Sequence, residues 1–400
     1  MNKLEDNAPQ KSKVKIVLMA LGVLFIASNL RAPLTSVGPV IAELSTSLGL
    51  SNVWAGMVTT IPLIAFATLS GFAPKVSRKY GMELVLLAAL IILALGLGIR
   101  QWGTISTLFI GAALVGIAIT MGNVLMPAYI KNSFPKQVGL MMGLYSVAMN
   151  LTAALAAGFS IQLGNWTGMG WRGSIGIWFF LALFTLVIWL PQVKRKKLET
   201  QQGSTLKEES KVNLYRSKLA WAVTIFMGLQ SFLFYCVAAW FPKVMQSWGM
   251  TPEDSGWVLS YVQFAQLPIS FVGAIIASKM NNQKFLAVLS GLLFGIGILG
   301  IIVFKTEYII LWSICIGTAS GLAFSLSMLF FVLRSHHSTQ AAELSGMAQA
   351  FGYLIAACGP PLFGAIYDST GDWVAALWML VGISIILLIA GFIAGRDELL

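Results

Sequence analysis

The sequence predicts an all-α membrane protein of twelve transmembrane helices, arranged as two six-helix parallel pseudo-repeats. Of its 400 residues, 57% are hydrophobic and only 10% are charged, whereas a soluble domain carries about 25% charged residues. The apolar residues gather into runs long enough to cross a bilayer, which takes about 20 residues per helix. The second half of the chain also repeats features of the first.

Each apolar run is expected to form a helix, because backbone groups in lipid must be paired within the spanning element. The twelve runs lie at residues 15–42, 53–74, 82–99, 104–130, 138–163, 172–191, 218–245, 255–278, 284–304, 308–333, 342–367 and 373–394.

One long polar segment, residues 192–217, divides the runs into six and six. We interpret it as a cytoplasmic linker between an N-terminal half, residues 1–191, and a C-terminal half, residues 218–400. The stretch that begins at Gly56 resembles the one that begins at Gly256, and both occupy the second run of their half. Since each half has an even number of runs, the two halves are expected to be parallel repeats.

The placement of positive charge predicts the orientation. Nearly all of the 26 Lys and Arg residues fall on the side of the membrane that holds the N-terminus; the exceptions are Arg31, Arg100, Arg172, Lys243 and Lys305. The positive-inside rule then places both termini in the cytoplasm, in a multi-pass protein of the bacterial cytoplasmic (inner) membrane. Tryptophans near the opposite span ends are interpreted as an outer aromatic belt: Trp54, Trp102, Trp166, Trp171, Trp240, Trp248, Trp257, Trp312, Trp373 and Trp378.

The net charge of +11 is explained by cytoplasmic loops that face anionic lipid. The expected partner is therefore the lipid bilayer, with no nucleic acid.

The stretch "SNLRAPLTSVGP", residues 28–39, places Arg31 well inside the first run, while none of the 15 Asp and Glu residues lies in the middle of a run. An ionisable side chain at such depth is costly unless it faces a watery cavity or a partner. We interpret Arg31 as the charge that binds an anionic or strongly polar solute, because its planar donors suit a delocalised group. The alternative is an arginine that bonds helix carbonyls or reaches outward.

Helical spacing places Ser28 and Thr35 on the face of Arg31 and turns Asn29 toward a neighbouring helix. Pro33 and Pro39 are predicted to kink the helix and to leave carbonyl groups available to a site.

Other runs carry polar side chains near mid-span, and these complete the predicted substrate-binding set. Each could instead bridge two helices, which is worth about 1 kcal/mol or less, but their concentration in both halves favours a central cavity. They are Asn123, Tyr145, Asn150, Gln230, Tyr235, Gln263, Gln266, Gln349 and Tyr353. No phosphate-binding loop, zinc motif or catalytic triad is present, so we expect neither an enzyme nor a cofactor or metal site.

Three motifs resemble the cyanate permease/2-nitroimidazole transporter family of the major facilitator superfamily: "NLRAPLTSVGPVIAEL", "GNVLMPAYIKNSFP" followed by "GLYS", and "ELSGMAQAFGYLIAACGPPLFGAIYDSTGDW". The resemblance covers essentially the whole chain. It implies a secondary carrier that works by alternating access, with Arg31, Asn123, Gln349 and Tyr353 in the matching site regions. One departure is Lys75, which stands where the superfamily's loop after the second span usually has an aspartate.

We therefore expect a secondary transporter of a small anionic or polar nitrogen-containing solute, cyanate-like or nitroimidazole-like, working as a monomer. The alternative is a multidrug or toxic-compound exporter of the same superfamily, although such exporters usually have a buried carboxylate. Proton coupling and facilitated diffusion both stay open.

Overall fold

The computed structural model describes residues 13–134, 137–193, 214–336 and 338–400, and every regular element in these ranges is a helix. The helices are α1 (Lys13–Thr35), α2 (Val37–Leu48), α3 (Asn52–Leu69), α4 (Ala73–Tyr80), α5 (Met82–Arg100), α6 (Ile105–Ser133), α7 (Val138–Gly158), α8 (Ser160–Thr167), α9 (Trp171–Gly176), α10 (Trp178–Trp189), η1 (Leu190–Gln192), η2 (Leu214–Arg216), α11 (Lys218–Ser247), α12 (Pro252–Ser278), α13 (Lys284–Phe304), α14 (Ile309–Leu333), α15 (Ser338–Thr370) and α16 (Trp373–Ala394). Twelve segments of the described chain are long and apolar enough to span a membrane, which confirms the predicted number.

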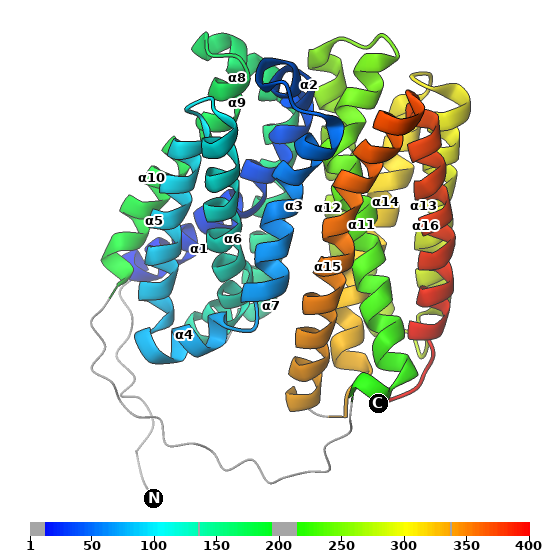
Figure 1. Ribbon diagram of the computed structural model, residues 1–400. Helices are drawn as coiled ribbons and strands as arrows, with labels where there is room; N and C mark the ends of the chain where they lie inside the picture. Colours follow the sequence, from blue (N-terminus) through cyan, green and yellow to red (C-terminus); the bar gives the residue numbers. More distant parts are fainter. Residues whose placement is uncertain (1–12, 135–136, 194–213, 337) are drawn as a thin grey trace, which may run out of the picture.

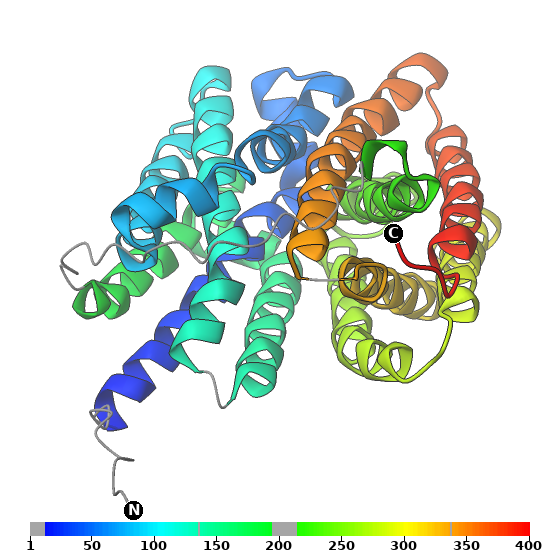
Figure 2. The ribbon, with the colours of Figure 1, turned by 90° about the horizontal axis from the view of Figure 1, so that it is seen from below.

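The helices form two groups that lie side by side. Figure 1 shows α1 to α10 on one side and α11 to α16 on the other, and Figure 2 shows the same two groups from below. We call the end that carries α2 and α8 the upper end, and the end that carries α4 and the C-terminus the lower end. Residues 194–213 of the predicted linker lie outside the described residues, and the predicted boundaries of the two halves stay a prediction.

The two groups meet mainly where α3 packs on α15 and α7 packs on α12. Pro361 has no N–H for the carbonyl group of Ala357, one turn earlier in α15. The hydroxyl of Thr60 on α3 donates to that carbonyl oxygen at 2.7 Å. At the other contact, the hydroxyl of Ser260 on α12 donates to the carbonyl oxygen of Ala154 on α7 at 2.7 Å. Hydrogen bonds from side chain to backbone thus join the groups at both contacts.

Glycine permits the close approach of α3 and α15. A Cβ atom at Gly56 would lie 2.7 Å from the carbonyl carbon of Pro360, which is closer than packed carbon atoms allow. We expect Gly56→Val to destabilise the protein by about 1–3 kcal/mol through overpacking, seen as a lower melting temperature. The matched control is Gly382→Val on α16, where no described atom lies within 4 Å of the added Cβ. Equal melting temperatures for the two variants would contradict this packing account.

The predicted first run, 15–42, is a broken helix. α1 ends at Thr35 and α2 begins at Val37, so the prolines do interrupt the helix as predicted. Two carbonyl groups next to the break already have partners within the protein. The carbonyl oxygen of Pro33 accepts from Arg100 Nη1 at 2.9 Å, and that of Ser36 accepts from the Ser160 hydroxyl at 2.7 Å.

Two arginines at span ends, Arg100 and Arg334, are buried. Each is only 2% exposed. Arg100 bonds the carbonyl oxygens of Pro33 and Ile175, and Arg334 bonds the carbonyl oxygen of Ala394 and the side chain of Gln283. Backbone carbonyls at helix ends have unused acceptor capacity, and a guanidinium group supplies several donors at once. Both of these arginines are enclosed by the protein but lie at span ends, whereas Arg31 lies inside its span.

The predicted tryptophan belt is only partly correct. Trp54, Trp102, Trp166 and Trp378 are exposed on the surface of the helix bundle, but Trp171, Trp240 and Trp373 are buried. The buried rings pack inside the protein; Trp240, for example, donates from Nε1 to the carbonyl oxygen of Pro360 at 2.8 Å. Position near a span end does not distinguish a ring that faces lipid from one that faces a neighbouring helix.

Candidate binding site at Arg31

Arg31 lies on α1 one turn before the break and contacts three other helices. Its Nη1 atom donates to Asn150 Oδ1 on α7 at 3.2 Å. The guanidinium carbon lies 4.6 Å from the ring centroid of Phe234 on α11 and 5.6 Å from that of Phe324 on α14. In the part of the chain that the structure describes, no carboxylate forms an ion pair with it. The guanidinium is therefore held by one neutral amide oxygen and two aromatic faces, and none of its five N–H donors has an anionic partner among the described residues.

Three tyrosines complete the surroundings of this guanidinium. Tyr145, Tyr235 and Tyr353 lie close enough to Arg31 to interact with it electrostatically. The Tyr145 hydroxyl also donates to Asn123 Oδ1 at 3.4 Å. The predicted residues Asn123, Tyr145, Asn150, Tyr235 and Tyr353 thus come together around Arg31 from α6, α7, α11 and α15.

Ser28 and Thr35 share the Arg31 face of α1, and their hydroxyl groups fasten α1 to α7. The Thr35 hydroxyl lies 3.1 Å from the carbonyl oxygen of Ala153, and Ser28 Oγ accepts from the Thr152 hydroxyl at 3.0 Å. Asn29 points away from Arg31 and donates to Thr185 Oγ1 on α10 at 2.8 Å, as the helical spacing indicates. These bonds fasten α1 to α7 and to α10 and so fix the position of the helix that carries Arg31.

The four predicted glutamines differ in their surroundings. Gln230 donates to the Ser231 hydroxyl at 2.7 Å and Gln349 donates to the Ser345 hydroxyl at 2.9 Å, both within their own helices. Gln263 and Gln266 on α12 are fully buried, and three of their four amide atoms have no hydrogen-bond partner among the described residues.

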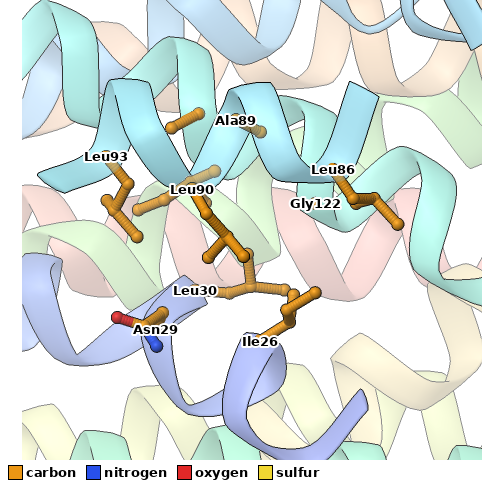
Figure 3. Close-up of a pocket in the computed structure, with 10 residues that line it drawn as sticks. Ile26, Asn29, Leu30, Leu86, Ala89, Leu90, Leu93 and Gly122 are labelled. Carbon is orange, nitrogen blue, oxygen red and sulfur yellow. The ribbon is translucent and has the colours of Figure 1, made fainter. Parts of the chain in front are cut away.

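A small cavity lies beside Arg31, lined also by Thr35, Thr59, Phe234 and Tyr235. Its free space is about that of one water molecule, so a larger solute would need the surrounding helices to move apart. A second cavity, shown in Figure 3, lies between α1, α5 and α6 and is apolar except for Asn29. The second cavity offers a single polar side chain, Asn29, whose Oδ1 has no partner among the described residues. The cavity beside Arg31 offers a guanidinium and three hydroxyl groups and is the better candidate for a polar ligand.

Sequence reasoning missed Phe324, Thr59 and Thr152 as neighbours of the site. Phe324 stands in a run with several other phenylalanines, and nothing in its spacing marks the one that faces Arg31.

A polar cluster joins the two groups of helices at the upper end; we call Asn52, Lys243 and Asp368 the upper polar cluster. Lys243 Nζ donates to Asn52 Oδ1 at 2.6 Å, and the Asn52 amide donates to Asp368 Oδ1. Asp368 Oδ2 also accepts from the backbone N–H of Val53 at 3.2 Å, in the first turn of α3, where negative charge is favoured. The cluster therefore links α3 to both α11 and α15.

Removing the carboxylate is expected to loosen the upper end. The measurement is the labelling rate of Ala238→Cys, whose side chain lines the Arg31 cavity, by a membrane-impermeant maleimide in a background with Cys236, Cys315 and Cys358 replaced by alanine. Asp368→Ala should raise that rate about two- to fivefold, which corresponds to the 0.5–1 kcal/mol of an exposed polar contact. Asp372→Ala, which removes only the N-cap bond of α16 to Val374, should leave the rate unchanged. Equal labelling rates in the Asp368→Ala and Asp372→Ala variants would show that the upper polar cluster does not hold the upper end closed.

Comparisons with known proteins agree with this architecture. A family model described as Major Facilitator Superfamily matches residues 18–341 and, in a second match, residues 220–398. The chain is 40% identical over 391 residues to the uncharacterized transporter YycB of Bacillus subtilis (strain 168), covering 98% of this chain and 96% of that protein. It is 36% identical to the 2-nitroimidazole transporter of Escherichia coli (strain K12), covering 96% of this chain and 97% of that protein.

Two more distant matches also cover nearly the whole chain. The cyanate transport protein CynX of Escherichia coli (strain K12) is 26% identical, with 92% of this chain and 96% of that protein covered. A crystal structure of a D-xylose-proton symporter superposes with a TM-score of 0.79 at 15% identity, covering 96% of this chain and 99% of that one. The latter shows a shared fold.

The twelve spans and these matches define a membrane transporter rather than an enzyme. The chain belongs to the Major Facilitator Superfamily and, within it, to the family of the cyanate and 2-nitroimidazole transporters.

Proposed function

We propose that this chain is a secondary transporter that moves a small anionic or polar nitrogen-containing solute, cyanate-like or nitroimidazole-like, by alternating access. In this proposal Arg31 is the main substrate-binding charge, and the transporter works as a monomer. The single observation that carries it is the guanidinium without a carboxylate in the described chain, contacted by Asn150 from one group of helices and by Phe234 and Phe324 from the other.

An anion suits this position for an electrostatic reason. Arg31 is half-buried, and a cation that is partly withdrawn from water without a counter-ion is poorly stabilised. A solute that brings a negative or strongly dipolar group supplies the missing partner. Planar groups such as a nitro group or a carboxylate match the fork of guanidinium donors, and the flanking Phe rings favour flat solutes. The names of two relatives, a 2-nitroimidazole transporter and a cyanate transport protein, point to the same class.

The position of Arg31 also suits alternating access. Since its contacts come from both groups of helices, a solute bound there touches both, and its release requires them to separate on one side. With both termini in the cytoplasm, as the distribution of Lys and Arg favours, the upper end faces the exterior. The upper polar cluster and the Gln246 bond to the carbonyl oxygen of Pro39, 3.2 Å long, then close the exterior side.

The experiment is a thermal-shift screen of the purified protein against cyanate, 2-nitroimidazole, acetate, benzoate and tetraphenylphosphonium. A ligand that binds only the folded protein raises the melting temperature according to its affinity and concentration. We expect a rise with cyanate, 2-nitroimidazole or the carboxylates and none with the phosphonium cation. Stabilisation by the cation alone would favour an exporter of cationic compounds and contradict the proposal.

A further inference from the structure

Three buried polar side chains on α12 and α14 have side-chain atoms without a hydrogen-bond partner. They are Gln263, at both amide atoms, Gln266, at Oε1, and Ser320, at Oγ. None is more than 2% exposed, and no described residue supplies a partner for these atoms. A buried polar atom that lacks a partner costs stability. Three such residues on two adjacent helices therefore call for a specific explanation.

Helical geometry turns the two glutamines toward the interior. On α12 the residues Pro268, Val272 and Ile275 are exposed and mark its outer face. At 100° per residue, Gln263 and Gln266 point about 150° away from the mean direction of that face. They therefore face the centre of the bundle.

The two helices that flank α12 are the ones that supply contacts to Arg31. On one side, Ser260 of α12 bonds the carbonyl oxygen of Ala154 on α7 at 2.7 Å. The fifth and eighth spans run in opposite directions. One turn forward along α12 from Ser260 is Gln263, and one turn back along α7 from Ala154 is Asn150, so these two residues lie at the same level. Asn150 is the amide that bonds Arg31.

On the other side, α12 packs against α14. A Cβ atom at Gly321 of α14 would lie 2.8 Å from the carbonyl oxygen of Gln266. Ser320 lies one turn before Phe324 on the same face of α14, and Phe324 is one of the rings that flank the guanidinium. Gln263, Gln266 and Ser320 thus face the space bounded by two neighbours of Arg31.

We propose that Gln263, Gln266 and Ser320 form a second, uncharged end of the Arg31 site, which binds a hydrogen-bonding group of the solute. This inference rests on the proposed function and narrows it. Arg31 offers donors alone, whereas the amides and the hydroxyl offer both donors and acceptors. A site with these two ends, flanked by aromatic rings, selects a ring-sized planar solute that carries both an electron-rich group and a ring N–H. A three-atom ion such as cyanate engages only the Arg31 end.

The test compares two probes of the same ring size, 2-nitroimidazole and 2-nitrofuran, of which the second lacks the ring N–H. Binding to purified wild type, to the double variant Gln263→Met/Gln266→Met and to Arg31→Gln is measured by titration calorimetry. The double variant should bind 2-nitroimidazole about tenfold more weakly, the equivalent of about one net hydrogen bond. Its affinity for 2-nitrofuran should change by less than about twofold. Arg31→Gln should lower the affinity for both probes.

Several outcomes overturn the inference. Equal losses for both probes in the double variant would indicate damage to the fold, and no loss for either probe would remove the glutamines from the site. Wild type that binds cyanate but not 2-nitroimidazole would overturn this inference and leave the proposed function standing. Wild type that binds neither 2-nitroimidazole nor any of the anions of the thermal-shift screen would overturn both.

A second measurement needs no ligand. Since the Gln263 amide has no partner in the protein, Gln263→Met should leave the melting temperature of the ligand-free protein unchanged or raise it. The control is Gln246→Met, which removes the bonds to the carbonyl oxygen of Pro39 and to the Ser255 hydroxyl and should lower the melting temperature. A fall of equal size in the two variants would show that Gln263 serves the fold, and the inference would be wrong.

Discussion

Arg31→Gln is expected to reduce the initial rate of solute uptake into proteoliposomes by at least about 30-fold, because removing one partner of a buried charge interaction costs about 2 kcal/mol or more. The glutamine side chain is uncharged, is two bonds shorter than arginine and lacks the paired donors of the guanidinium. Arg31→Lys is expected to reduce the uptake rate nearly as much. An ammonium group keeps the charge but cannot lie flat between Phe234 and Phe324 or meet a planar group with two parallel bonds.

Arg172→Gln is the matched control for Arg31, because Arg172 is exposed and its guanidinium packs against Gly103 and the ring of Trp171, 5.7 Å from the ring centroid. It should transport like wild type. The protein amount in the vesicles must be equal for all variants. Uptake within about twofold of wild type by both Arg31 variants would remove Arg31 from the substrate site.

Arg100→Met is expected to lower the stability of the protein by about 3 kcal/mol, since it removes two charge-assisted hydrogen bonds worth about 1.5–3 kcal/mol each and methionine recovers part of the packing. Arg100 bonds the carbonyl oxygen of Pro33 at 2.9 Å and that of Ile175 at 3.2 Å. Without it, the broken end of α1 loses its support two residues from Arg31. Both the melting temperature and uptake should fall.

Arg172→Met provides the comparison for Arg100→Met, and its melting temperature should match that of wild type. If Arg100→Met also unfolds at the wild-type temperature, the guanidinium does not support the break between α1 and α2. A lower melting temperature with normal uptake would show that Arg100 stabilises the fold but does not help to position Arg31.

Much of the fold follows from local properties of the chain. A transmembrane helix needs only length and hydropathy, so all twelve spans could be located from the sequence. The break in the first span was also foreseeable, since Pro33 and Pro39 lack the N–H that the helix requires.

Less of the candidate site could be predicted. Arg31 stands out because a charge inside an apolar run is rare, but its partners Asn150, Phe234 and Phe324 come from three other helices. Which helix faces which is decided by packing of the whole bundle. The burial of Arg100 could not be predicted for the same reason. A charge at the end of a run is normally solvated, and only the path of α1 places a free carbonyl group beside it.

The central claim, that Arg31 binds the transported solute between the two groups of helices, is tested most directly by a structure determined with 2-nitroimidazole or cyanate bound. We predict density for the solute against the Arg31 guanidinium, within hydrogen-bond distance and between Asn150, Phe234 and Phe324. Solute density at another place, with Arg31 Nη1 still bonded only to Asn150, would contradict the claim.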